Sequence, residues 1–290
     1  MSCLEFSPGN VDLLRNLGYA QAERGRLEES LEVMRQASAL DPRSWGNQLS
    51  VADTLTLLHR PREAREAANR GLALNPQQID LIRHKVLTYL QEGDLAGARA
   101  VVAAVPADVA PTALVTDFAY YNNTGVLDAA QRDLLLRLTP AAFGDNRGGW
   151  AYALATEHWL RGNWSDAAKY AEHARAAFAD QHTRSPGSSE LHSLLRSMLG
   201  ILGRGDLAAQ EGQPAVALAP IDKFTDMGGS AMKFLAFIYP RIGRPELAIE
   251  VLERMLNVRY RTTSGWLRVE PYFDPLRGHP RFAQLERRAD

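Results

Sequence analysis

The sequence has a single cysteine, almost no net charge and no long apolar run, and each shortage excludes a class of protein. One cysteine, Cys3, can form neither an intramolecular disulfide nor a thiolate metal cluster, which is typical of a reducing compartment. A net charge of −1 gives no electrostatic basis for binding nucleic acid or an anionic membrane. No apolar run approaches the roughly 18 residues of a membrane span, and the first residues do not resemble a secretory leader. We therefore expect a cytoplasmic protein without a membrane span.

Lysine is also scarce. Of the 33 basic residues all but four are arginine, and the exceptions are Lys85, Lys169, Lys223 and Lys233. Together with the abundant alanine, this indicates coding in a GC-rich genome rather than an arginine-based binding function. The 46% of hydrophobic residues can supply a sizeable core for one large domain or two ordinary ones.

Motifs of catalysis are missing as well. The chain contains neither a glycine-rich phosphate loop followed by Lys-Ser/Thr nor a GxGxxG turn after a strand. The segment "LHRPRE" (58–63) has a His-Arg pair but lacks the aspartate and asparagine of a kinase catalytic loop. No two histidines are four residues apart, and His158 falls at a predicted core position. We expect no enzymatic activity, no metal and no cofactor.

What the sequence does contain is a period of 34 residues. Pro8, Pro42 and Pro76 are spaced by this interval, and numbering Pro42 as position 32 aligns three consecutive units without an insertion. Positions 8, 20 and 27 hold small or medium-sized residues in each unit. They are Gly18, Ser30 and Ala37, then Ala52, Ala64 and Gly71, then Val86, Ala98 and Val105. Such a period is typical of a repeat architecture.

Each unit is predicted to be a pair of helices joined by a short turn. Apolar residues spaced three and four apart give each helix one buried stripe. Gly25 and Gly93 fall at the turn, where a positive φ is needed, and Pro42 and Pro76 cannot continue the second helix. The small residues are expected where the two helices cross, because a missing side chain lets the backbones approach.

The repeats continue less regularly after residue 110. The stretch Ala110–Pro140 has two helical patterns interrupted by "NNTG" (Asn122–Gly125) and is interpreted as a degenerate unit. The remaining predicted features are units at 151–174, 195–220 and 235–255, a loop at Gln181–Glu190 and an insertion at Ala219–Ser230.

The C-terminal stretch Ser264–Arg288 is rich in proline and large apolar residues. Three prolines forbid a long helix before Pro280, which suits a helix's first position. The apolar residues are Trp266, Leu267, Phe273, Leu276, Phe282 and Leu285. We predict that they fold back over the exposed end of the last helix pair, because a terminal repeat otherwise exposes an apolar face.

The 34-residue pattern resembles the tetratricopeptide repeat (TPR) family, although position 4 lacks the usual tryptophan and Lys85 stands where an apolar residue is expected. The segments Leu138–Ala155 and 203–290 also resemble the C-terminal TPR region of bacterial multidomain signalling proteins. In those proteins the array follows a serine/threonine kinase, adenylate cyclase-like or TolB-like portion. Because Pro8 again holds position 32, the chain begins partway through a repeat; we expect a fragment of a longer protein, with a capping half-repeat as the alternative.

The resemblance implies an all-α, right-handed superhelix of about seven helix pairs. We divide the chain into a partial repeat at 1–10, a solenoid at 11–263 and a capping segment at 264–290. Such a fold has a concave groove lined by the first helix of each pair. We therefore expect a non-catalytic scaffold that binds a protein or peptide, with no nucleic acid as partner. The alternatives are a C-terminal regulatory module of a larger signalling enzyme and a small-molecule-binding solenoid that uses the aromatic C-terminal half of the groove.

Positions 5, 9 and 12 of the first helices point into the groove by helical geometry. Two arginines at equivalent positions, with aromatic residues farther along, suit an extended peptide that carries a carboxylate and apolar anchors. The alternative is that the arginines are solvated and that the aromatics form core between repeats. The candidate binding residues are Arg15, Tyr19, Asp53, Arg83, Tyr120, Tyr152, Trp159 and Phe237.

Overall fold

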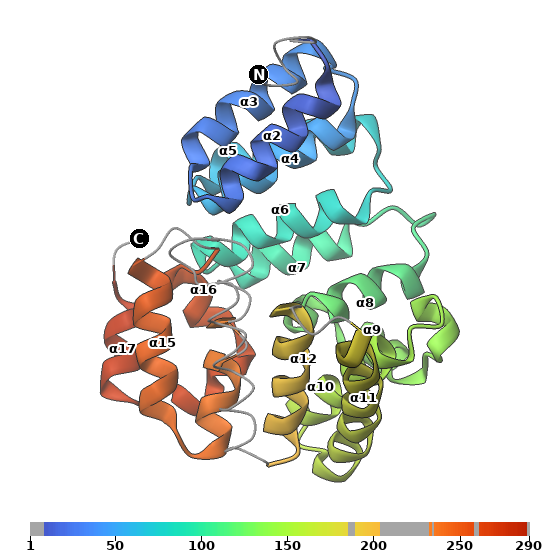
Figure 1. Cartoon of the computed structure of the whole chain (residues 1–290), viewed down its shortest axis with the longest axis vertical. Helices are drawn as coiled ribbons and strands as arrows, with labels where there is room; N and C mark the ends of the chain where they lie inside the picture. Colours follow the sequence, from blue (N-terminus) through green and yellow to red (C-terminus); the bar gives the residue numbers. More distant parts are fainter. Residues whose placement is uncertain (1–8, 185–188, 204–231, 234, 258–260, 289–290) are drawn as a thin grey trace.

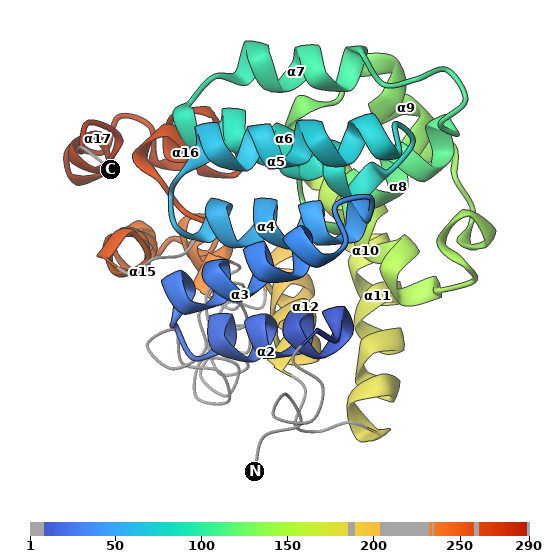
Figure 2. The same ribbon diagram turned by 90° about the horizontal axis from the view of Figure 1, so that it is seen from above.

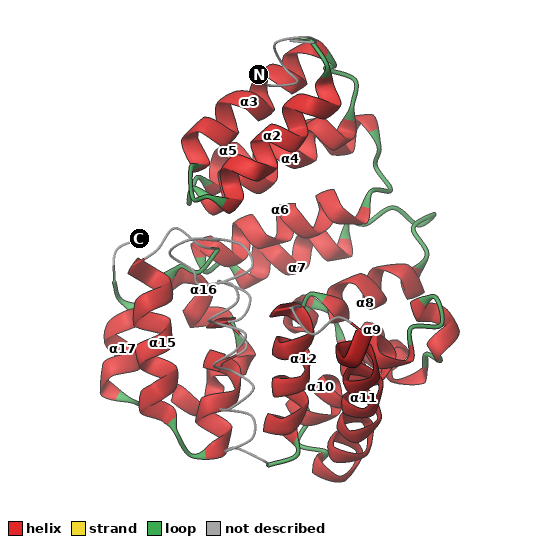
Figure 3. Cartoon of the chain, in the orientation of Figure 1, coloured by secondary structure: helices red, strands yellow, loops and turns green. Residues whose placement is uncertain are grey.

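The structure is a computed structural model that describes residues 9–184, 189–203, 232–233, 235–257 and 261–288. Within these ranges every regular element is a helix and no strand occurs (Figure 3). Residues 232–233 and 235–238 are helical and lead into η3. The elements are α2 (Val11–Glu23), α3 (Leu27–Leu40), α4 (Trp45–Leu57), α5 (Pro61–Leu74), α6 (Ile79–Glu92), α7 (Leu95–Ala103), α8 (Pro111–Tyr120), η1 (Thr124–Val126), α9 (Ala129–Arg137), η2 (Pro140–Phe143), α10 (Arg147–Leu160), α11 (Trp164–Arg184), α12 (Ser189–Ile201), η3 (Tyr239–Ile242), α15 (Pro245–Asn257), α16 (Ser264–Val269), η4 (Pro271–Leu276) and α17 (Pro280–Glu286).

The helices pair and stack in chain order. α2 packs on α3, α4 on α5, α6 on α7, α8 on α9 and α10 on α11, and neighbouring pairs join through α3 with α4 and α5 with α6. Figure 2 shows α2 to α7 as successive layers. In Figure 1, α6 and α7 cross the middle of the molecule, with α8–α12 on one side below them and α15–α17 on the other. This arrangement confirms the predicted all-α solenoid of helix pairs.

Local sequence signals set the ends of these helices. Gly25 and Gly93 adopt φ values of 74° and 77° at the turns between paired helices, as predicted. Asp128 and Gln131 form a reciprocal capping box at the start of α9. α3 ends at Leu40 and α5 at Leu74, in each case before the proline of position 32.

Small residues lie where helices cross, as the register predicts. Ala52 and Ala64 are fully buried. At Gly71, an added Cβ would lie 2.7 Å from a methyl carbon of Leu81, so the close contact between α5 and α6 requires the missing side chain.

His158, predicted as a packed core residue, stacks on Tyr170 with ring centroids 5.5 Å apart, and burial lowers its pKa.

The irregular units agree with the sequence in part. The degenerate unit forms α8 and α9 with η1 between them, as expected from its interrupted pattern. The predicted loop Gln181–Glu190 is wrong at both ends, because α11 continues to Arg184 and α12 begins at Ser189. From Trp164, where α11 begins, no proline or glycine occurs before Pro186, so no helix-breaking residue ends this helix at Gln181. The insertion Ala219–Ser230 and the sixth unit from residue 204 to Pro220 lie outside the described residues.

The described helices include none that is long and apolar enough to cross a membrane. The longest, α11, carries charged residues along its length.

Candidate functional site

The C-terminal segment 261–288, called here the docked segment, reaches back across the molecule to α6. α16 packs against α6 (Figure 1), and Thr263 donates a hydrogen bond to the carbonyl of Gln91 at 2.7 Å. An added Cβ at Gly265 would lie only 2.0 Å from the same carbonyl oxygen. Only glycine therefore permits this approach of two backbones. The contact joins parts of the chain more than 170 residues apart.

An ion pair fixes the start of the docked segment. Arg261 lies 2.7 Å from the carboxylate of Asp53 on α4, and His84 lies 3.6 Å from it. Burial tends to raise the pKa of Asp53, but the charge of Arg261 holds it below its usual value. Burial lowers the pKa of His84 to about 3, so this imidazole is neutral near pH 7. Asp53, predicted to bind a partner, thus has an intramolecular partner.

Aromatic rings continue the contact. Tyr272 stacks on Phe237 with ring centroids 4.1 Å apart, and its ring centroid lies 5.8 Å from that of Trp159. Its hydroxyl donates to Asn122 at 3.2 Å, and Asn122 in turn donates to the hydroxyl of Tyr152 at 2.8 Å. Phe237, Trp159 and Tyr152 are each less than a tenth exposed. Three more predicted groove residues therefore line a region that the chain itself fills.

Two charged side chains beside the aromatic rings, Arg241 and Glu270, have hydrogen-bond partners within the chain. Arg241 lies 3.9 Å above the Trp159 ring and donates to the carbonyls of Tyr272 and Phe237. Burial lowers the pKa of Arg241 to about 10. Glu270 accepts from the indole of Trp266 at 3.0 Å. The space left between these side chains is a cavity of about 20 Å³, close to the volume a single water requires. This cavity is too small for a metabolite.

The end of the docked segment lies on the last helix pair. Arg281 of α17 pairs with Glu246 and Glu253 of α15 at 2.6 and 3.0 Å. Phe282 is fully buried, and the ring centroids of Phe282 and Phe273 are 5.9 Å apart. The sequence placed this segment over the last helix pair; its additional contact with α6 was not foreseen.

A second region of the same helices is open. A cleft of about 650 Å³, called here the tyrosine cleft, lies between α6, α8 and α10. It is lined by Gln77, Gln78, Ile79, Asp80, Ala113, Thr116, Asp117, Tyr120, Tyr121, Ala142, Phe143, Asn146 and Gly149. Tyr120 and Tyr121 are 42% and 43% exposed, and their rings meet edge to face at 5.1 Å. These two tyrosines present the largest exposed aromatic surface of the cleft.

Arg83 lies behind the lining of the tyrosine cleft. Its guanidinium donates to Asp117 at 2.9 Å and to Asp80, and lies 3.7 Å from the centre of the Tyr121 ring. Burial raises the pKa of Asp117, Arg83 opposes that rise, and the nearby charge of Asp80 adds to it. The Arg83 side chain is only 8% exposed and already pairs with two carboxylates, and its binding of a partner's carboxylate stays a prediction.

The other two candidate residues lie on α2, outside both regions. Arg15 pairs loosely with Asp12 at 3.8 Å, and the Tyr19 hydroxyl lies 2.7 Å from that of Ser50. Of the eight candidates, the structure therefore places Tyr120 alone in the lining of the open cleft. Sequence reasoning missed Asp80 because it lies at position 2 of the third unit, and only positions 5, 9 and 12 were expected to face the groove. It missed Asp117 and Phe143 because the register of the degenerate unit and of the following turn could not be assigned.

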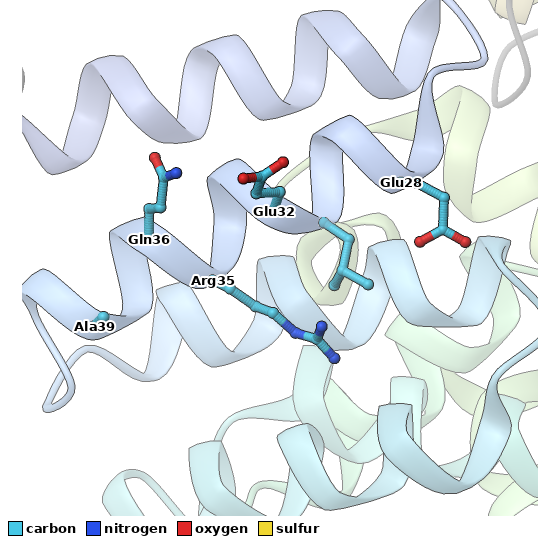
Figure 4. Close-up of a pocket in the computed structure, with 6 residues that line it drawn as sticks. Glu28, Glu32, Arg35, Gln36 and Ala39 are labelled. Atoms are coloured by element: carbon cyan, nitrogen blue, oxygen red, sulfur yellow. The ribbon is translucent and has the colours of Figure 1, made fainter.

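A second hollow provides a comparison. It has a volume of about 590 Å³ and follows the outer face of α3, lined by Glu28, Leu31, Glu32, Arg35, Gln36 and Ala39 (Figure 4). Its side chains are mainly charged or polar, and none is aromatic. Arg35 pairs across to Glu63 on α5 at 3.1 Å. No group of three or more metal-binding side chains lies together in the described residues.

Comparisons with known proteins identify the fold. No protein-family model and no curated protein matches the chain. Among solved structures, it is similar to a chain of the APC/C hetero-tetramer Cut9–Hcn1, with a TM-score of 0.51 and 16% identity over 98% of this chain and 50% of that one. It thus spans about half the length of that chain. A tetratricopeptide repeat protein from Parabacteroides merdae has a TM-score of 0.42 and 11% identity over 91% and 99% of the two chains.

The first of these likenesses agrees with the stacked helix pairs described above, and together they show an all-α, TPR-like solenoid fold. At such low identity they concern the fold alone. The resemblance to signalling proteins with a kinase, cyclase-like or TolB-like portion rests on the sequence segments and stays a prediction, as does the division of the chain into three parts.

Proposed function

We propose that this TPR-like solenoid is a non-catalytic interaction scaffold that binds a short peptide segment of a partner protein in the tyrosine cleft. One observation supports this most strongly. The C-terminal half of the groove is filled by the docked segment, whereas the cleft between α6, α8 and α10 keeps about 650 Å³ open beside two exposed tyrosines. Clefts of this size accommodate several side chains.

The chemistry of the lining suits a peptide. Tyrosine offers a large contact area at a low cost in conformational entropy, and its hydroxyl can form a hydrogen bond. Gln77, Gln78 and Asn146 add side-chain amides, which can both donate to and accept from a peptide backbone. The hollow on α3 lacks aromatic side chains, so we assign it no partner.

Peptide selection tests the proposal. The full chain is immobilised, a phage library of random heptapeptides is selected on it, and the affinities of synthetic peptides are measured by fluorescence anisotropy. Tyr120→Ala should weaken binding of the selected peptides about tenfold, the usual cost of truncating an aromatic anchor. Glu32→Gln, in the α3 hollow, is the matched control and should leave binding unchanged. Selected peptides that bind Tyr120→Ala as well as the wild type would exclude the cleft as the site.

A further inference from the structure

The charges that face the tyrosine cleft are negative. Among the residues that line it, the ionisable acids are Asp80 and Asp117, whose side chains are 42% and 20% exposed. Arg83 lies behind them with 8% of its side chain exposed, and it is outside the lining. A molecule that enters the cleft therefore meets the carboxylates before the guanidinium. Two carboxylates share this one guanidinium, so the group as a whole carries excess negative charge.

The helix termini at the cleft do not cancel this charge. α6 begins at Ile79 and α10 at Arg147, and each start carries a partial positive charge of about one half. Asp80 lies in the first turn of α6, where it offsets that partial charge. The side chain of Asn146 accepts a hydrogen bond from the amide of Gly149, so one of the N–H groups at the start of α10 already has a partner. Burial is the main cause that raises the pKa of Asp117; Arg83 opposes the rise, and the charge of Asp80 makes a smaller contribution to it.

Aromatic rings favour a nearby cation. Among the described residues, guanidinium groups stack on rings with Arg65 over Tyr89, Arg83 over Tyr121 and Arg241 over Trp159, at 3.7 to 3.9 Å. Such contacts are attractive because the ring face is electronegative. Tyr120 lies beside the two carboxylates and is 42% exposed.

We infer that the peptide bound in the tyrosine cleft carries an arginine or lysine side chain that reaches Asp80 and Asp117, with an apolar residue beside it on Tyr120. This inference rests on the proposed function and specifies the partner: a basic–apolar segment, rather than the acidic segment that Arg15 and Arg83 suggested from sequence. Charge-assisted hydrogen bonds to the two aspartates would supply specificity, and the tyrosine would supply contact area.

The peptides selected on the wild-type chain test the inference. They should be enriched in arginine and lysine relative to the unselected library. Replacing the basic residue of a selected peptide by neutral citrulline, or by norleucine where it is lysine, should weaken its binding about tenfold. On the double variant Asp80→Asn/Asp117→Asn the same replacement should have almost no effect. Glu32→Gln again serves as the control, because it removes one exposed carboxylate from the α3 hollow.

The outcomes separate the two proposals. Peptides that need Tyr120 but are enriched in acidic or uncharged residues would overturn the basic partner and leave the peptide-binding cleft intact. A selection that yields no peptide dependent on Tyr120 would overturn both. The double variant Asp80→Asn/Asp117→Asn should fold, because each asparagine retains an oxygen that can accept from Arg83. A thermal melt followed by circular dichroism checks this.

Discussion

The two regions, the filled side beneath the docked segment and the open tyrosine cleft, differ in what covers them. On the filled side, Asp53, Trp159 and Phe237 lie beneath the docked segment, and the rings of Phe237 and Tyr272 are only 4.1 Å apart. On the open side, Tyr120 and Tyr121 remain more than 40% exposed. Whether a residue predicted for the groove is available to a partner therefore depends on how the C-terminal segment folds.

The largest expected effect comes from removing an aromatic ring on the filled side. Phe273 is fully buried and its ring lies 5.3 Å from that of Phe237 and 5.2 Å from that of Trp266. Phe273→Ala should lower the free energy of unfolding by about 3–5 kcal/mol, because it leaves a cavity. Urea denaturation measures this change. A loss below about 1 kcal/mol would mean that the docked segment is not packed as described.

The next effect tests the contact between backbones. Gly265→Ala should cost about 1–3 kcal/mol, because its Cβ has no space beside the carbonyl of Gln91. Gly46→Ala is a matched control: both glycines are the second residue of a helix, but the nearest atom to a Cβ at Gly46 is 3.6 Å away. It should be neutral or slightly stabilising. Equal effects of the two substitutions would contradict the close approach of α16 to α6.

A smaller effect distinguishes the ion pair on the filled side from an exposed one. A double-mutant cycle with Asp53→Asn and Arg261→Gln should give a coupling free energy of about 1 kcal/mol, because both side chains are about three-quarters buried. The same cycle on Arg35 and Glu63, which are 52% and 42% exposed, should give less than about 0.5 kcal/mol. Similar couplings at the two pairs would contradict the burial of Asp53 under the docked segment.

The smallest effect on stability belongs to the open side. Tyr120→Ala should change the free energy of unfolding by less than about 1 kcal/mol, since much of the ring is already in water. Its effect should appear in peptide binding instead. A loss of stability as large as that of Phe273→Ala would show that Tyr120 belongs to the core and not to a binding surface.

The sequence predicted most of the architecture because local signals encode it. Gly25, Gly93 and the prolines of position 32 set helix ends, and Ala52, Ala64 and Gly71 lie buried at helix crossings as expected. These features repeat every 34 residues, so each unit supports the assignment of the next. The predicted loop at Gln181–Glu190 was too long. The polar composition suggested a loop there, but no helix-breaking residue lies between the start of α11 and Pro186.

The site was harder to predict because it depends on contacts between distant parts of the chain. Gln91 meets Thr263 across 172 positions, and nothing in a 34-residue pattern encodes this pairing. Trp159 and Phe237 therefore have the pattern of groove residues although they are buried. The apolar residues of the C-terminal segment did predict that it packs on the solenoid, but they did not indicate that it reaches α6.

The measurement that tests this account most directly is hydroxyl-radical footprinting of the full chain, with oxidation read residue by residue by mass spectrometry. If the docked segment fills one side of the groove and the tyrosine cleft is open, Tyr120 and Tyr121 should be oxidised much faster than Tyr272, Trp159 and Phe237, which are at most 8% exposed. Comparable oxidation of the two groups would contradict the division of the groove into a filled and an open side.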